Sequence, residues 1–348
     1  MTFEPLAQRR HDSIDGVPEP AENPMLMGHE GAARSIAAAF AAGRLHHALL
    51  LTGPSGIGKA TFAFHVARHV LAGTEGSGAD GLQRADPDSR LFRAVAQGAH
   101  PGVLHLTRPE NERGKGYKTV ITVDEIRRLG RFLSLSAHDG GYRVVIVDPA
   151  DDLNASAANA LLKSLEEPPA RTLFLLISHV PGRLVPTIRS RCQTIRLDPL
   201  SDAEVLEALS GLGLAVPEAE TARAELARRA AGSVRAAILL TEYGGLEIAT
   251  TIDNILGSTP FDLALAQRLA DAVTSRDQAI QFDIFNDHLL DNLAAAASGD
   301  LGDKMRAGRR AEIWSRLRED IAVTDTYNLD KRHHVVSSLR RVHDSLHR

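Results

Sequence analysis

The hydrophobic pattern of the first 200 residues alternates between strand-like runs and helical stretches. Apolar residues recur at helical spacing over residues 29–42, 59–71, 121–135 and 155–165. Short runs, several of them apolar enough to be buried on both faces of a sheet, predict strands at residues 46–51, 100–106, 142–148, 172–178 and 192–197. Helices that alternate with buried strands predict an α/β domain with a mostly parallel sheet.

The pattern changes after Pro199, where the strand-like runs stop. Residues 201–242 and 246–348 are rich in alanine and leucine and keep helical periodicity throughout. We therefore expect an α/β domain at residues 25–199, a small helical domain at 200–243 and a second helical domain at 244–348. Residues 1–24 are polar and rich in proline, so we expect a disordered N-terminal segment there.

Composition narrows the possible environments and partners. Cys192 is the single cysteine of the 348 residues, so an internal disulfide and a zinc site built from several cysteines are excluded. A lack of disulfides is usual for a cytoplasmic protein. The formal net charge of −4 provides no general attraction to nucleic acid, so contacts with DNA must be local or made through partners. The N-terminus lacks an apolar core, which argues against a signal peptide or a membrane span.

A phosphate-binding loop is indicated by "LLLTGPSGIGKATFAFHV" at residues 49–66. The pattern G-x-x-x-x-G-K-[ST] is matched except at its last position, where Ala60 replaces the hydroxyl residue. Backbone N–H groups of such a loop bind phosphate oxygens, and its lysine reaches the outer phosphates. The candidate nucleotide-binding residues here are Gly53, Pro54, Ser55, Gly56, Ile57, Gly58, Lys59, Ala60 and Thr61.

Two residues of this region argue against hydrolysis. Ala60 offers no oxygen to Mg²⁺, and Thr61 is turned away from that position by about 100° on a helix. Asp148 ends a predicted strand where a metal-binding aspartate is expected, but Pro149 follows it and cannot orient a water molecule. We expect Mg²⁺ binding to be weak or absent and no other metal site. The loop is equally consistent with a site for ATP or ADP and with a tight strand-to-helix turn that binds nothing.

Longer motifs resemble a known family. "NALLKSLEEPPARTLFLLIS" at residues 159–178 and "TIRSRCQTIRL" at 187–197 resemble the bacterial sliding-clamp loader subunits of the AAA+ class. Residues 28–61 and 123–154 are similar to the same family, and the resemblance covers about residues 25–240. It implies an AAA+ P-loop α/β domain with a parallel sheet, a helical lid and an all-α C-terminal collar that holds a ring of subunits together.

The resemblance also implies roles for individual residues. Arg191 matches the arginine finger, which projects into the ATP site of a neighbouring subunit. Ser178 matches the polar sensor at the end of its strand, and Arg235 matches a second sensor in the lid. Family members with zinc carry four cysteines after the first helix. The glycine-rich stretch after Gly73 has none, so we expect no zinc.

A weakened ATP site beside an intact Ser-Arg-Cys element indicates the non-motor subunit of such a loader. We expect a stator with little ATPase activity, held with motor and other subunits in a hetero-oligomeric ring that loads the sliding clamp on primed DNA. One alternative is an ATP-hydrolysing motor subunit or a related AAA+ ATPase, which requires the groups that Ala60 and Pro149 lack. A stand-alone P-loop enzyme is another, but it leaves the Ser-Arg-Cys element and the helical domains unexplained.

Overall fold

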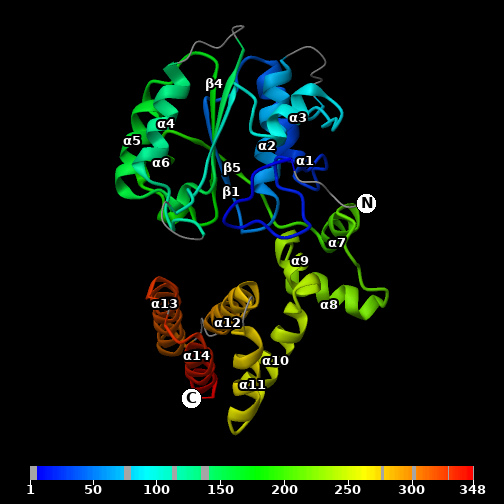
Figure 1. Ribbon diagram of the computed structural model, residues 1–348, viewed down its shortest axis with the longest axis vertical. Coiled ribbons are helices and arrows are strands. Elements are labelled where there is room, and N and C mark those ends of the chain that lie inside the picture. Colours follow the sequence, from blue (N-terminus) through cyan, green and yellow to red (C-terminus); the bar gives the residue numbers. More distant parts are fainter. Residues whose placement is uncertain are drawn as a thin grey trace. The chain divides into compact units, whose positions relative to one another are not determined.

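The computed structural model forms two compact units, residues 1–236 and 237–348, which we describe separately (Figure 1). The described residues are 6–73, 80–111, 116–134, 141–275, 278–299, 303–327 and 329–347. The division falls inside helix α9 (Val234–Glu242). The finer boundaries expected at residues 199 and 243 stay predictions.

A five-stranded parallel sheet forms the centre of the first unit (Figure 1). Its order is β2-β3-β4-β1-β5, and every neighbouring pair is parallel. The strands are β1 (Ala48–Thr52), β2 (Val103–Leu106), β3 (Arg143–Val147), β4 (Thr172–Ser178) and β5 (Gln193–Arg196). Each corresponds to a run that the hydrophobic pattern predicted, and the expected parallel sheet is confirmed.

Helices cover both faces of the sheet because its central strands are apolar on both sides. Every residue of β1 and of β4 is buried. Leu49 and Leu51 pack into one core and Leu50 into the other, as the alternation of side chains along a strand requires. One layer holds α1 (Glu30–Ala41), α2 (Lys59–Ala72) and α3 (Arg90–Ala96), and the other holds α4 (Val123–Ser134), α5 (Ala155–Glu166) and α6 (Pro186–Arg189) (Figure 1).

Short helices follow the sheet within the first unit. Ser201 caps α7 (Asp202–Gly211) through a capping box with Glu204, and α8 (Glu220–Ala230) follows. Two single turns of 3-10 helix, η1 (Ala150–Asp152) and η2 (Pro181–Arg183), follow β3 and β4.

The second unit is helical, as expected from its periodicity. Its helices are α10 (Gly245–Gly257), α11 (Leu263–Val273), α12 (Ala279–Gly299), α13 (Lys304–Tyr327) and α14 (Lys331–Leu346). They surround a core that includes Phe282, Phe285 and Leu339. The expected fold class, a P-loop α/β domain with a parallel sheet followed by helical regions, is therefore confirmed. Within the described parts of the chain, no helix is both long and apolar enough to cross a membrane.

The expectation of disorder over residues 1–24 is wrong for residues 6–24. Glu22 is 5% exposed, and its Oε1 accepts a 2.7 Å hydrogen bond from the Ala7 N–H. Ala21 joins the core beside α2, and Arg68 Nη2 donates to its carbonyl oxygen at 2.7 Å. The segment has too few apolar residues for a core of its own and gains its order by packing against α2. The described residues do not include residues 1–5. They also do not include residues 74–79, which belong to the stretch that we expect to bind no zinc.

Replacing Leu50 by alanine tests the two-sided burial of β1. Leu50 is 1% exposed, so Leu50→Ala should lower the free energy of unfolding by about 2–5 kcal/mol through lost contacts and the cavity left behind. Urea denaturation followed by circular dichroism measures this loss. Val180→Ala, at a side chain that is 47% exposed, is the control and should cost under about 0.5 kcal/mol. Equal effects of the two substitutions would contradict the central position of β1.

Candidate functional site

The predicted site residues gather where three parallel strands end. The phosphate-binding loop follows β1, Asp148 follows β3, and Ser178 ends β4. Thr52 pairs with Ser178 in the register of β1 and β4, so the loop begins beside the end of β4. The carboxyl ends of parallel strands meet at one edge of a sheet, which is where ligands bind in α/β folds.

The loop itself depends on glycine. Gly56 and Gly58 have φ values of 77° and 93°, which disfavour any other residue. A Cβ atom on Gly56 would lie 2.2 Å from Ser233 Oγ. The carbonyl oxygen of Gly56 also accepts a 3.3 Å hydrogen bond from the N–H of Arg235. The residues that begin α9 therefore lie directly on the loop.

Lys59 is directed at its own loop. The side chain is 3% exposed, and Nζ donates to the carbonyl oxygens of Gly53, at 2.8 Å, and Pro54. Burial lowers the pKa of Lys59 to about 8, against the charges of Asp148 and Asp151, which raise it. The ammonium group thus already has partners within the chain.

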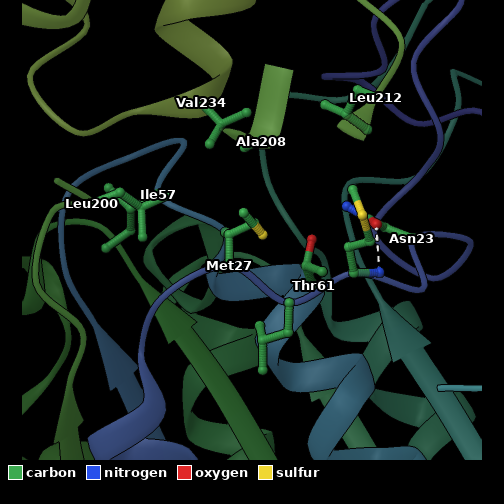
Figure 2. Close-up of a pocket in the computed structure, with 11 residues that line it drawn as sticks. Asn23, Met27, Ile57, Thr61, Leu200, Ala208, Leu212 and Val234 are labelled. Atoms are coloured by element: carbon green, nitrogen blue, oxygen red, sulfur yellow. Dashed lines mark hydrogen bonds between the residues drawn. The ribbon is translucent and has the colours of Figure 1, made fainter. Parts of the chain in front are cut away.

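The other loop residues divide between surface and core. Pro54 and Ser55 are exposed, Ile57 is buried, and Ala60 is half-buried against the core of the first unit. Thr61 lines a small cavity of about 70 Å³ together with residues that include Asn23, Met27, Leu200, Leu212 and Val234 (Figure 2).

Asp148 is surrounded by basic side chains that the sequence did not reveal. His105, from β2, places Nε2 at 3.5 Å from Asp148 Oδ2. Burial alone would raise the pKa of Asp148, but His105 lowers it, and the charges of His179 and Arg10 act in the same direction. The carboxyl pKa therefore lies below its usual value, and the group is an anion at neutral pH. A histidine within the apolar run of β2 was a usable signal for this contact, whereas Arg10 lay in a segment expected to be disordered.

Ser178 lies at the end of β4, as expected, and its side chain is hydrogen-bonded to Asp151. It is fully buried, and its hydroxyl donates to Asp151 Oδ1 at 2.7 Å. Asp151 Oδ2 also accepts from the N–H groups of His179 and Val180. Asp151 thus connects the end of β4 to η1. Asp152 accepts from Arg108 Nε at 2.6 Å.

Arg235 reaches this edge of the sheet, as its expected role requires. Its N–H contacts Gly56, and its Nη1 donates to the carbonyl oxygen of Asp12. The guanidinium is therefore bound to the N-terminal segment.

Arg191 lies away from the other site residues. It precedes β5, whose first residue, Gln193, pairs with Leu49 of β1. The four residue-to-residue steps from Leu49 to Gly53 span ~13 Å in an extended strand, so Arg191 and the loop lie toward opposite edges of the sheet. Arg191 Nη2 forms a 2.6 Å ion pair with Glu166 Oε1, and Nη1 donates to the Thr187 carbonyl oxygen at 2.9 Å.

Cys192 follows Arg191 and packs beside the second core of the sheet domain. Burial raises the pKa of its thiol to about 11, so the thiol is protonated at neutral pH. A buried thiol in this protonated state is unreactive.

The residues at this edge do not fit a metal-bound nucleotide in their present arrangement. Ala60 supplies no oxygen ligand, Lys59 is bonded to its own loop, and Arg235 is bonded to Asp12. Among the described residues, no group of three or more His, Cys, Asp or Glu side chains is placed to hold a metal ion. Phosphate groups would have to displace contacts that the chain makes with itself.

Comparison with known proteins gives one family and several relatives. The family model described as "DNA polymerase III, delta subunit" matches residues 28–201. The DNA polymerase III subunit delta′ of Pseudomonas aeruginosa is 44% identical over 147 residues, which cover 42% of this chain and 41% of that protein. The DNA polymerase III subunit delta′ of Escherichia coli K12 is 37% identical over 217 residues, which cover 62% of this chain and 61% of that protein.

Both of these alignments span less than two thirds of the relatives' own length. A solved structure with some similarity is the RuvB Holliday junction branch migration motor of Thermotoga maritima. It is 19% identical, with 79% of this chain and 80% of that chain covered and a TM-score of 0.42.

The lowered pKa of Lys59 predicts how stability changes with pH. The unfolded lysine has a pKa near 10.4, so above pH 8 the unfolded chain binds a proton that folded Lys59 has released. The free energy of unfolding of the unmodified chain, relative to Lys59→Met, should therefore rise by about 2 kcal/mol between pH 7 and pH 10. Urea denaturation at each pH measures the difference. The exposed Lys163, changed to methionine, is the control and should show no such rise. A flat difference for Lys59→Met would mean that its ammonium is hydrated.

Proposed function

Because this chain belongs to the DNA polymerase III delta subunit family, we propose that it is the delta-prime-type, non-motor subunit of a clamp loader. In this role it forms part of a ring that loads the sliding clamp on primed DNA and supplies Arg191 to the ATP site of a neighbour. The motifs at residues 159–178 and 187–197, which predicted the clamp-loader family, lie within the matched region.

The position of Arg191 is the observation that carries this proposal. The residue lies toward the edge of the sheet opposite to its own phosphate-binding loop, so it can serve a nucleotide only on another subunit. A guanidinium is always charged, and its planar donors suit the oxygens of a transferring phosphoryl group. The ion pair with Glu166 is partly exposed, with side chains 34% and 49% accessible. Such pairs stabilise by about 1 kcal/mol or less, so Arg191 is easily released to a phosphate.

The chain's own loop supports a non-motor role. Hydrolysis requires a metal ligand after Lys59 and a group that orients water beside Asp148, and Ala60 and Pro149 provide neither. We therefore propose that ATP or ADP, where it binds this loop at all, is not turned over. The loss of both groups also argues against a motor subunit.

We propose that the partners are the motor and delta subunits of the same ring. Residues 244–348 would form the collar through which the ring is held, since this helical region lies outside the nucleotide-binding fold. Contacts with the clamp and with primed DNA would be made by the assembly, which agrees with a net charge of −4 on this chain. The site of action would be the cytoplasm.

Replacing Arg191 by alanine tests the role in trans. Arg191→Ala should lower the rate of ATP hydrolysis at the neighbouring site by roughly 10³-fold or more, because the charge on the phosphoryl group loses its partner. The clamp-stimulated ATP turnover of the reconstituted loader should fall by the fraction of the total turnover that this neighbouring site contributes. Arg191→Lys should not restore the rate, since an ammonium group lacks the planar donors.

The exposed Arg189 provides the matched control. Arg189→Ala should leave turnover unchanged, and both variants should assemble with the partner subunits on a sizing column. Full turnover by an assembled Arg191→Ala loader would refute the assignment of Arg191.

The non-motor role also predicts the effect of removing Lys59. Lys59→Ala should change clamp-stimulated turnover of the assembled loader by less than about twofold, because this loop would hydrolyse nothing. The measurement is steady-state phosphate release with all partner subunits unmodified. A collapse of turnover would mean that nucleotide on this subunit has a role in the cycle.

A further inference from the structure

The N-terminal segment, residues 6–24, is bound by Tyr117, by Arg235 at the phosphate-binding loop, and by α2, the helix that follows this loop. Tyr117 donates its hydroxyl to the Arg9 carbonyl oxygen at 2.9 Å, and Arg235 Nη1 donates to that of Asp12. Further along the segment, two side chains of α2 bind its backbone. His65 Nε2 contacts the Asn23 carbonyl oxygen at 3.1 Å, and Arg68 contacts that of Ala21. Backbone carbonyl groups, rather than side chains, thus anchor the segment at both ends.

The segment also has a defined internal conformation. The N–H of Arg10 donates to Ser13 Oγ at 2.6 Å, the N–H of Ser13 donates to the Arg10 carbonyl oxygen at 3.2 Å, and Ser13 Oγ donates to Glu19. Glu22 Oε2 accepts from the Glu19 N–H at 3.0 Å. Ile14, Glu19 and Glu22 are buried. Residues 10–13 therefore form a turn that is held in place by the rest of the segment.

This turn brings positive charge to Asp148. Burial lowers the pKa of Arg10, while the charge of Asp148 is the largest influence that raises it. The charge of Arg10 in turn helps to lower the pKa of Asp148. Burial lowers the pKa of His11, against the charges of Asp12 and, less strongly, Asp148, which raise it. In a P-loop site, the carboxylate that follows this strand faces the metal ion of the nucleotide. Here a guanidinium of the same chain supplies the opposing charge.

We propose that residues 9–13 occupy the phosphate end of the P-loop site and exclude nucleotide until the segment is displaced. One of the groups that would meet a nucleotide, the Arg235 guanidinium, donates to the Asp12 carbonyl oxygen instead. For a second, Asp148, the charge of Arg10 helps to lower the pKa. The third, Lys59, is bonded to Gly53 and Pro54. Nucleotide must replace these contacts before it binds, so its apparent affinity is reduced by the fraction of molecules in which the segment is open.

The inference deepens the proposed function and rests on it only in taking nucleotide as the excluded ligand. A subunit whose loop is covered by its own chain would not follow the nucleotide cycle of its neighbours, which suits a non-motor subunit.

Nucleotide binding to the isolated full-length chain tests the proposal. Binding of a fluorescent ADP analogue, measured by anisotropy, should be ~10-fold or more tighter for Arg10→Ala than for the unmodified chain. Tyr117→Phe, which removes only the hydroxyl that holds Arg9, should tighten binding in the same direction, and the double variant should bind most tightly. Arg93→Ala is the matched control, because Arg93 lies outside the segment, is paired with Asp88 at the surface and has a side chain that is 56% exposed.

Three outcomes of the binding experiment have clear meanings. Tighter binding by Arg10→Ala and Tyr117→Phe, with Arg93→Ala unchanged, supports the proposal. Equal affinity of all five chains overturns it. Failure of every variant to bind overturns it as well, because the segment would then not be what keeps nucleotide away.

Hydrogen exchange provides a second measurement that needs no substitution in the segment. Saturating ADP should speed the exchange of the Arg10 and Ser13 amides, whose hydrogen bonds hold the turn, in the unmodified chain but not in Lys59→Ala. Unchanged exchange in a chain saturated with ADP would overturn the proposal. Both experiments use this chain alone, so a failure of the proposed function, seen only in the assembled loader, is distinguished from a failure of this inference.

Discussion

The parallel pairing of β1 with its neighbours is the constraint on which the site depends. Because β1, β3 and β4 run in the same direction, the residues that follow them meet at one edge of the sheet. The same pairing sends the residues that precede β5 toward the other edge. One arrangement of strands therefore separates the phosphate-binding loop from Arg191, as the role in trans that we propose for Arg191 requires.

The charges around Asp148 matter because its side chain is largely buried, with 19% of its surface exposed. A buried anion is costly unless opposite charges or hydrogen bonds compensate it. A metal-bound nucleotide would place a cation beside such a carboxylate, but Ala60 provides no oxygen for the metal. His105 and Arg10 take over part of the compensation. The basic neighbours of Asp148 thus supply positive charge at a place where a metal ion would otherwise supply it.

Much of the fold could be predicted because its signals are local. The strand-like runs and helical periodicities correspond to the observed elements, and the change of pattern after Pro199 marks where strands end. Residues 6–24 were misjudged because their order comes from contacts with α2, Tyr117 and Arg235, which are distant in sequence. Composition indicates whether a segment has enough apolar residues to form a core of its own. It does not indicate whether the segment will pack against a core formed by other parts of the chain.

The sequence by itself determined the class of fold, the phosphate-binding loop and the two positions, Ala60 and Pro149, that lack groups for hydrolysis. These follow from residue identity at fixed spacing, and no tertiary contact can restore a missing hydroxyl. Only the tertiary structure decided what the remaining polar groups bind. Ser178 faces Asp151, Arg191 faces Glu166, and Arg235 faces Asp12. The partner of a side chain depends on which distant segments fold against it, and residue identity at one position cannot specify that.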